Sequence, residues 1–108
     1  MAMSEPNFNL LTLPDFVLAE IDERISVLRD ELPQRNPGAM IAPLQRLTKI
    51  RGHFAFDLIS SIAWAAQAVC ATAADNSREL NSVELRALQH AIDSMDRARR
   101  TALLAVAV

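Results

Sequence analysis

The sequence predicts an all-α protein, a bundle of three main helices over about residues 14–32, 43–74 and 81–106. Of the 108 residues, 18 are alanine and 14 are leucine, which are strong helix formers, whereas only two are glycine. Few glycines leave little material for the tight turns that join β-strands. Apolar residues also recur at intervals of three and four, which is the period of an amphipathic helix.

The first helix is expected to begin at Pro14, because proline is favoured at the first helical position. Pro33, Pro37 and Gly38 are expected to end it and to form a linker. Residues 1–35 contain seven acidic and three basic residues, so the negative charge is concentrated here. We expect a flexible N-terminal arm over 1–13 and one helical domain over 14–108. The apolar stripe of this helix consists of Val17, Leu18, Ile21, Ile25, Leu28 and Leu32.

The second helix is expected to open near Pro43 and to run to about Ala74, with a break or bend possible at Gly52. Residues 54–74 carry a single charge, at Asp57, and are apolar almost all round. Such a helix is buried on most sides or spans a membrane. Its many alanines and its polar side chains favour a buried or oligomer-interface helix over a membrane span. The predicted stripe is Leu44, Leu47, Ile50, Phe54, Leu58 and Ile62.

The third helix has the clearest start signal. Asn81 can cap it, Glu84 stands three residues on as in a capping box, and Leu80 with Leu85 fits a hydrophobic staple. Two pairs at i,i+4 spacing, Asp93–Arg97 and Asp96–Arg100, are in the favourable order. The predicted stripe is Leu85, Leu88, Ile92, Met95, Ala102 or Leu103, and Val106.

Composition argues against several classes of function. The 11 basic and 13 acidic residues give a net charge of −2, which is unsuited to a strongly basic nucleic-acid binder. The two histidines and Cys70 match no metal-ligand spacing, so we predict no metal and no cofactor. The lone cysteine and the lack of a secretory signal favour the cytoplasm. His53 and Asp57 lie four residues apart, but no nucleophile motif accompanies them, so we predict no enzymatic activity and no catalytic residue.

A mean hydropathy of +0.12 is high for so short a chain, and some of this apolar surface is expected to meet another chain. Phe16, Phe56 and Trp64 lie off the predicted stripes, where large aromatics can anchor an interface. The alternative for Trp64, the one tryptophan, is that it fills the core.

Three segments together resemble the QslA-type quorum-sensing anti-activators: the proline-capped acidic helix LPDFVLAEIDERI, the linker LPQRNPGAM and the alanine-rich helix FAFDLISSIAWAAQAV. The resemblance lies in the length, layout and general character of the whole chain. It implies a helical homodimer that binds the ligand-binding domain of a LuxR-type transcription activator. Binding would disrupt dimerisation of the activator, and with it DNA binding, without direct contact between this chain and nucleic acid or membrane.

Two other functions stay open. One is a small helical dimeric scaffold, and the other is a small DNA-binding regulator, which the basic clusters around Arg46 and Arg99 would serve.

From the residues themselves we assign two surfaces, one that binds the partner and one that mediates self-association. The residues predicted to bind the partner are Phe8, Leu10, Leu11, Phe16, Glu20 and Val27. Those predicted to mediate self-association are Phe54, Leu58, Trp64, Ala68, Leu103 and Val106.

Overall fold

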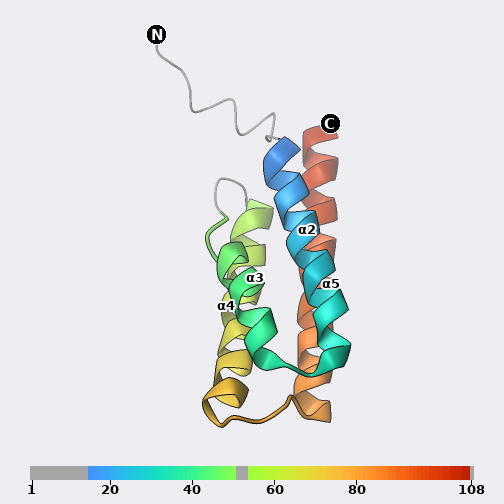
Figure 1. The fold of residues 1–108 in the computed structure, drawn as a ribbon. Helices are drawn as coiled ribbons and strands as arrows, with labels where there is room; N and C mark the ends of the chain where they lie inside the picture. The colour runs from blue at the N-terminus through green and yellow to red at the C-terminus, as the bar shows by residue number, and fades with distance from the viewer. Residues whose placement is uncertain (1–14, 51–53, 108) are drawn as a thin grey trace.

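Four α-helices and one short 3-10 helix make up the computed structural model, which describes residues 15–50 and 54–107 (Figure 1). Side chains are described for residues 17–50 and 55–102. No strand occurs in the described ranges, so the all-α prediction is confirmed. The elements are α2 (Asp15–Glu31), η1 (Leu32–Gln34), α3 (Pro37–Leu47), α4 (Phe54–Asp75) and α5 (Ser82–Ala107).

The helices run alternately in opposite directions, and each packs against its neighbours in the cycle α2–α3–α4–α5, with α5 returning to α2 (Figure 1). This is the topology of an up-and-down four-helix bundle, in which short connections make consecutive helices antiparallel neighbours. α2 and α4 therefore lie diagonally across the bundle from each other. Their outward faces point to opposite sides of the molecule.

The core confirms the stripes predicted for the first and last helices. The buried side chains of α2 and α5 fall at the expected positions, while Val17, Leu18 and Leu85 pack against the core from its edge. Large aliphatic residues alternate with charged residues along both helices, which gives each a clear apolar face. The buried residues at predicted positions are Ile21, Ile25, Leu28, Leu32, Leu88, Ile92, Met95 and Ala102.

The predicted second helix is wrong as a single element, because two helices, α3 and α4, replace it. The predicted linker is also wrong: Asn36 caps α3 by accepting a hydrogen bond from the Gly38 N–H at 3.1 Å, and Pro37 occupies the first helical position. α3 ends at Leu47, and the Ser60 hydroxyl of α4 donates to the carbonyl of Thr48 at 2.6 Å. The count of main helices is therefore four among the described residues. Gly52 lies outside them.

The face that α4 turns to the core also differs from the prediction. Phe56, expected to anchor an interface, is 1% exposed, whereas Leu58, expected in the stripe, is 52% exposed. The buried line is dominated by small residues, which allow α3 and α5 to approach α4 closely and leave room for the Phe56 ring. That line is Ala55, Phe56, Ile59, Ala63, Ala66, Cys70 and Ala73.

The predicted capping box at the start of α5 is confirmed. The Glu84 N–H donates to Asn81 Oδ1, and the Asn81 N–H donates to Glu84 Oε1, both at 2.9 Å. Leu80 just before the helix is 1% exposed, and its N–H donates to the carbonyl of Arg35 at 3.0 Å. This bond joins the α4–α5 connection to the α2–α3 turn at one end of the bundle.

Candidate protein-binding surface

The outward face of α4 is the main exposed apolar feature of the described residues. Leu58 is 52% exposed and Trp64 is 69% exposed. Between Asp57 and Asp75 the helix has no charged residue. A ridge of small exposed side chains runs along the centre of this outward face, and we call the whole the α4 face. The ridge consists of Ser61, Ala65, Ala68 and Thr72.

Trp64 lies between two hollows in the surface. The first, of about 480 Å³, is lined with Thr48, Lys49, Ser60 and Ser61. The second, of about 250 Å³, lies on the same helix and is lined by apolar side chains and one amide. We call it the alanine hollow; besides Trp64 it is lined by Ala65, Gln67, Ala68 and Ala71.

Gln67, which lines the alanine hollow, carries an unpaired polar group. Oε1 of Gln67 is buried and has no hydrogen-bond partner among the described residues. A buried amide oxygen without a donor is costly, and native proteins usually provide one. Gln67 was not among the residues predicted from the sequence. Only the packing of α4 could identify it, because an amide in an alanine-rich helix gives no periodic signal.

The residues predicted for self-association lie on the α4 face as far as they are described. Leu58, Trp64 and Ala68 are all exposed there, so the alternative in which Trp64 fills the core is wrong. Phe54 belongs to α4, and Leu103 and Val106 belong to α5, but their side chains fall outside the described residues.

The residues predicted to bind the partner lie on another side of the bundle. On α2, the carboxylate of Glu20 pairs with Arg24 at 3.6 Å and with Arg46 of α3 at 3.8 Å, and Val27 is half-buried. Because α2 and α4 are diagonal, the α2 part of the first predicted surface and the α4 part of the second are not brought together, whereas α5, which carries Leu103 and Val106, packs against α2. Phe16 belongs to α2, but its side chain is outside the described residues, as are all of Phe8, Leu10 and Leu11.

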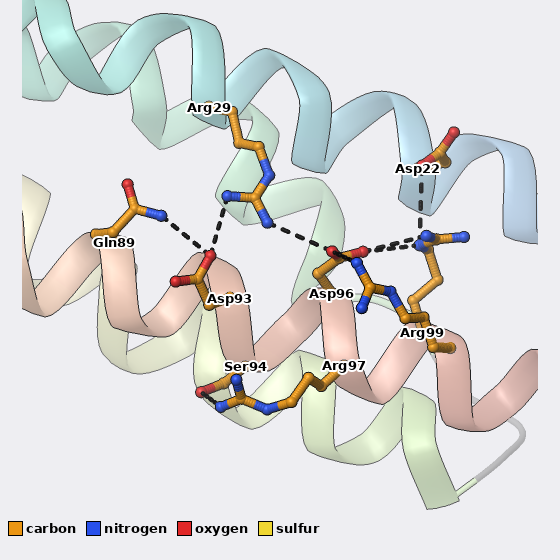
Figure 2. Close-up of polar contacts among 9 residues, drawn as sticks. Asp22, Arg29, Gln89, Asp93, Ser94, Asp96, Arg97 and Arg99 are labelled. Atoms are coloured by element: carbon orange, nitrogen blue, oxygen red, sulfur yellow. Dashed lines mark hydrogen bonds and ion pairs between the residues drawn. The ribbon is translucent and has the colours of Figure 1, made fainter.

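Figure 2 shows a network of ion pairs that joins α2 to α5. The Arg29 guanidinium contacts Asp93 at 3.0 Å and Asp96 at 3.4 Å. Asp96 also accepts from Arg99 at 3.1 Å and from Arg100 at 2.8 Å, which confirms the predicted Asp96–Arg100 pair. Asp93, by contrast, pairs with α2, and the predicted partner Arg97 donates to the Ser94 hydroxyl at 3.2 Å.

This network sets the charge of the seam between α2 and α5. Burial alone would raise the pKa of Asp96, but the hydrogen bond from Arg99 and the nearby guanidinium groups hold this pKa below its ordinary value. The hydrogen bond from Arg29 likewise lowers the pKa of Asp93. The basic cluster around Arg99 is therefore partly neutralised by carboxylates, which weakens its attraction for phosphate.

The described residues offer few groups suited to metal binding or nucleophilic catalysis. They contain no group of three or more histidine, cysteine, aspartate or glutamate side chains placed to hold a metal ion. Cys70 is buried, and burial together with the charge of Glu84 raises the pKa of its thiol to about 11. Its reactive thiolate is therefore scarce at neutral pH. His90 is exposed on α5, and His53 lies outside the described residues.

By length and composition, α4 also qualifies as a candidate membrane span over Ala55–Asp75, with 39% of its most apolar window buried inside the protein. The core helix of a soluble bundle passes the same test, because it too is long and apolar.

Comparison of the chain with protein-family models, with curated proteins and with solved structures found no match.

Proposed function

We propose that this protein is a non-enzymatic regulatory protein that binds a LuxR-type quorum-sensing transcription activator and blocks its dimerisation and DNA binding. The supporting observation for activator binding is the acidic outward side of α2, where Glu23 and Asp30 are exposed. Self-association is supported by the exposed α4 face with Trp64 69% exposed, since an exposed aromatic residue in an uncharged apolar patch is typical of a protein-binding surface. The partner class rests on the resemblance of the chain to QslA-type anti-activators.

The proposed mechanism needs no chemistry. An activator that reads two half-sites must pair two protomers, so occupying the pairing surface of one protomer removes most of its affinity for DNA. Partner capture is assigned to the outward side of α2, at Glu20 and Val27, together with Phe8, Leu10, Leu11 and Phe16. The exposed acids Glu23 and Asp30 on α2 add a negative field that would attract a basic patch on the partner.

Self-association is assigned to the α4 face on the opposite side of the bundle and to Phe54, together with the apolar end of α5, a helix that packs against α2. Since α2 and α4 lie diagonally, one copy can bind a second copy and an activator at the same time. The two activities are therefore separable by mutation, and the protein is proposed to act as a cytoplasmic homodimer.

The test mixes the full chain with the purified ligand-binding domain of a LuxR-type activator and measures the mass by size-exclusion chromatography with light scattering. We expect a stable complex, and we expect Phe16→Asp combined with Glu20→Lys to abolish it. Arg86→Glu on the exposed surface of α5 is the matched control and should leave capture intact. Capture that survives the α2 substitutions, with helicity unchanged, would overturn the assignment of α2 to the partner.

Two alternative functions give different results in the same set of assays. A small dimeric scaffold would dimerise but would not retain the activator domain. A DNA-binding regulator would bind duplex DNA with an affinity that falls steeply as salt is raised. The pairing of Asp96 with Arg99 and Arg100 argues against the second alternative, because it leaves fewer guanidinium groups for phosphate.

A further inference from the structure

We infer that two copies of this chain pair through α4, with Trp64 of each copy inserted into the alanine hollow of the other and its indole N–H donating to Gln67. This inference deepens the self-association proposed above and rests on it.

The first argument is that a projection and a matching depression lie on the same surface. Trp64 is 69% exposed, and Ala68 and Ala71 follow it at i+4 and i+7, which places all three along one side of the helix. A two-fold interface requires a patch that is complementary to itself. When two copies of α4 pair antiparallel about a point between Ala65 and Ala68, each Trp64 lies opposite the Ala68–Ala71 turn of the other copy.

The second argument is chemical and independent of shape. Gln67 lines the hollow, and its Oε1 is buried with no donor among the described residues. The indole N–H of tryptophan is a donor only, and it usually finds an acceptor when it becomes buried. The chain thus has an unpaired acceptor, shielded from solvent, on a side chain that lines the hollow, and an exposed tryptophan beside it. In the antiparallel pairing, rotation of the Gln67 amide about its last torsion offers Oε1 to the entering indole.

The third argument is the size of the surface. The 22 residues of α4 make a helix about 33 Å long. With flanking side chains of α3 and α5 the footprint can reach at most the width of the bundle, whose two shorter extents are 24 and 18 Å, and this corresponds to at most about 1,300 Å² buried over both copies. That area lies at the lower end of the range for stable specific interfaces, about 1,200–2,000 Å². The α4 face is therefore large enough for a dimer of two identical chains.

Charge distinguishes a second copy from a charged partner. The helix itself has no charged residue in the central part of the α4 face, and Asp57 and Asp75 lie at its two ends; on one flank, Lys49 lines the first hollow beside Trp64. In the antiparallel pairing, Asp57 of one copy approaches Asp75 of the other at an exposed rim, where like-charge repulsion is weak and screened by salt. Added salt should therefore leave the dimer unchanged or tighten it, whereas attachment to a basic partner would weaken with salt.

The experiment uses the one tryptophan of a chain that has no tyrosine. Sedimentation equilibrium and tryptophan emission are measured on the full chain over a wide dilution series. We expect the mass to rise from 11.9 kDa to twice that value and the emission of Trp64 to shift to shorter wavelength at the same midpoint. The salt dependence is recorded in parallel.

Three variants separate the contributions. By sedimentation, Trp64→Ala should raise the dissociation constant on the order of 100-fold or more, as for a central interface tryptophan. Gln67→Leu should raise the dissociation constant of the dimer about 10-fold when Trp64 is present. The same substitution should have little effect in the Trp64→Phe background, because phenylalanine fills the hollow but has no N–H to donate. Val83→Ala, a residue 68% exposed on α5 that does not line the hollow, is the control and should leave the constant unchanged.

The outcomes distinguish this inference from the proposal beneath it. A monomer at all concentrations would overturn both the pairing described here and the proposed self-association. This pairing alone would be overturned if the chain dimerises without a shift in the emission of Trp64 and if the Trp64→Ala variant has the same dissociation constant as the wild-type chain. Capture of the activator is measured separately and depends on α2, so its failure would not imitate either result.

Discussion

Phe56→Ala should destabilise the protein far more than Leu58→Ala, although the two residues are neighbours on one helix. The Phe56 side chain is 1% exposed and belongs to the core, whereas Leu58 is 52% exposed on the outward side of α4. The pair tests which face of an alanine-rich helix is turned inward. All other packing conclusions about α4 depend on that orientation.

The expected magnitudes follow from burial. Truncating a fully buried phenylalanine removes its transfer free energy and leaves a cavity, which together cost about 3–5 kcal/mol. Truncating Leu58 loses only the part of its surface that is out of water and leaves no enclosed cavity, so the cost is about 0.5–1 kcal/mol. Small domains are stable by about 5–15 kcal/mol in total, so Phe56→Ala should remove a large part of the free energy of unfolding.

The assay is urea unfolding followed by far-UV circular dichroism, at a concentration where sedimentation shows only the monomer, so that loss of dimer contacts does not add to the cost of Leu58→Ala. The midpoint of Phe56→Ala should fall sharply with an unchanged slope, and its melting temperature should fall by more than about 10 °C. If Leu58→Ala costs as much as Phe56→Ala, α4 is rotated toward the stripe predicted from the sequence. That result would refute the orientation on which the α4 face is built.

Three further predictions concern local features. Asn81→Ala should lower the free energy of unfolding by about 1 kcal/mol in thermal or urea unfolding, because it removes the side-chain cap from α5. The hydrogen bond from Arg78 and the backbone bond at Asn81 lower the pKa of Glu84 from 4.5 to about 2. The contribution of ionised Glu84 to the free energy of unfolding is therefore fully present above about pH 4.5 and is lost as the pH falls toward 2. In Arg78→Ala the free energy of unfolding should depend less on pH over this range. The Cys70 thiol, whose pKa is raised to about 11, should react with a thiol reagent at neutral pH only as fast as the protein unfolds, and rapid reaction in the native state would contradict its burial.

The sequence predicted α2 and α5 well because their large apolar residues alternate with charged ones. Ile21, Leu28 and Met95 each had a clear contrast with their neighbours, and all three are buried. The capping box at Asn81 was equally accessible, since capping depends on a few residues close together in the chain. Features determined within one turn of helix are those a single sequence predicts best.

The sequence could not predict α3 and the orientation of α4. Pro37 serves equally as a signal for a helix end or for a helix start, and the cap at Asn36 decides in favour of a start. In α4 the alanines on all sides remove the contrast between faces, so nothing local indicates that Phe56 is inside and Leu58 outside. That choice depends on how α3 and α5 pack against α4.

The candidate surface was predicted only in outline. Leu58, Trp64 and Ala68 were placed together on one surface, and the structure puts all three on the exposed side of α4. The hollow beside Trp64 and the unpaired oxygen of Gln67 depend on tertiary packing, so no sequence pattern indicates them.

The central claim, that this protein acts by binding a transcription activator, is tested most directly by the mass of a mixture. Light scattering of the chain with the ligand-binding domain of a LuxR-type activator should give one species heavier than either component, with the paired form of the activator depleted. Two separate peaks with the masses of the isolated proteins, at concentrations well above micromolar, would contradict the proposed function.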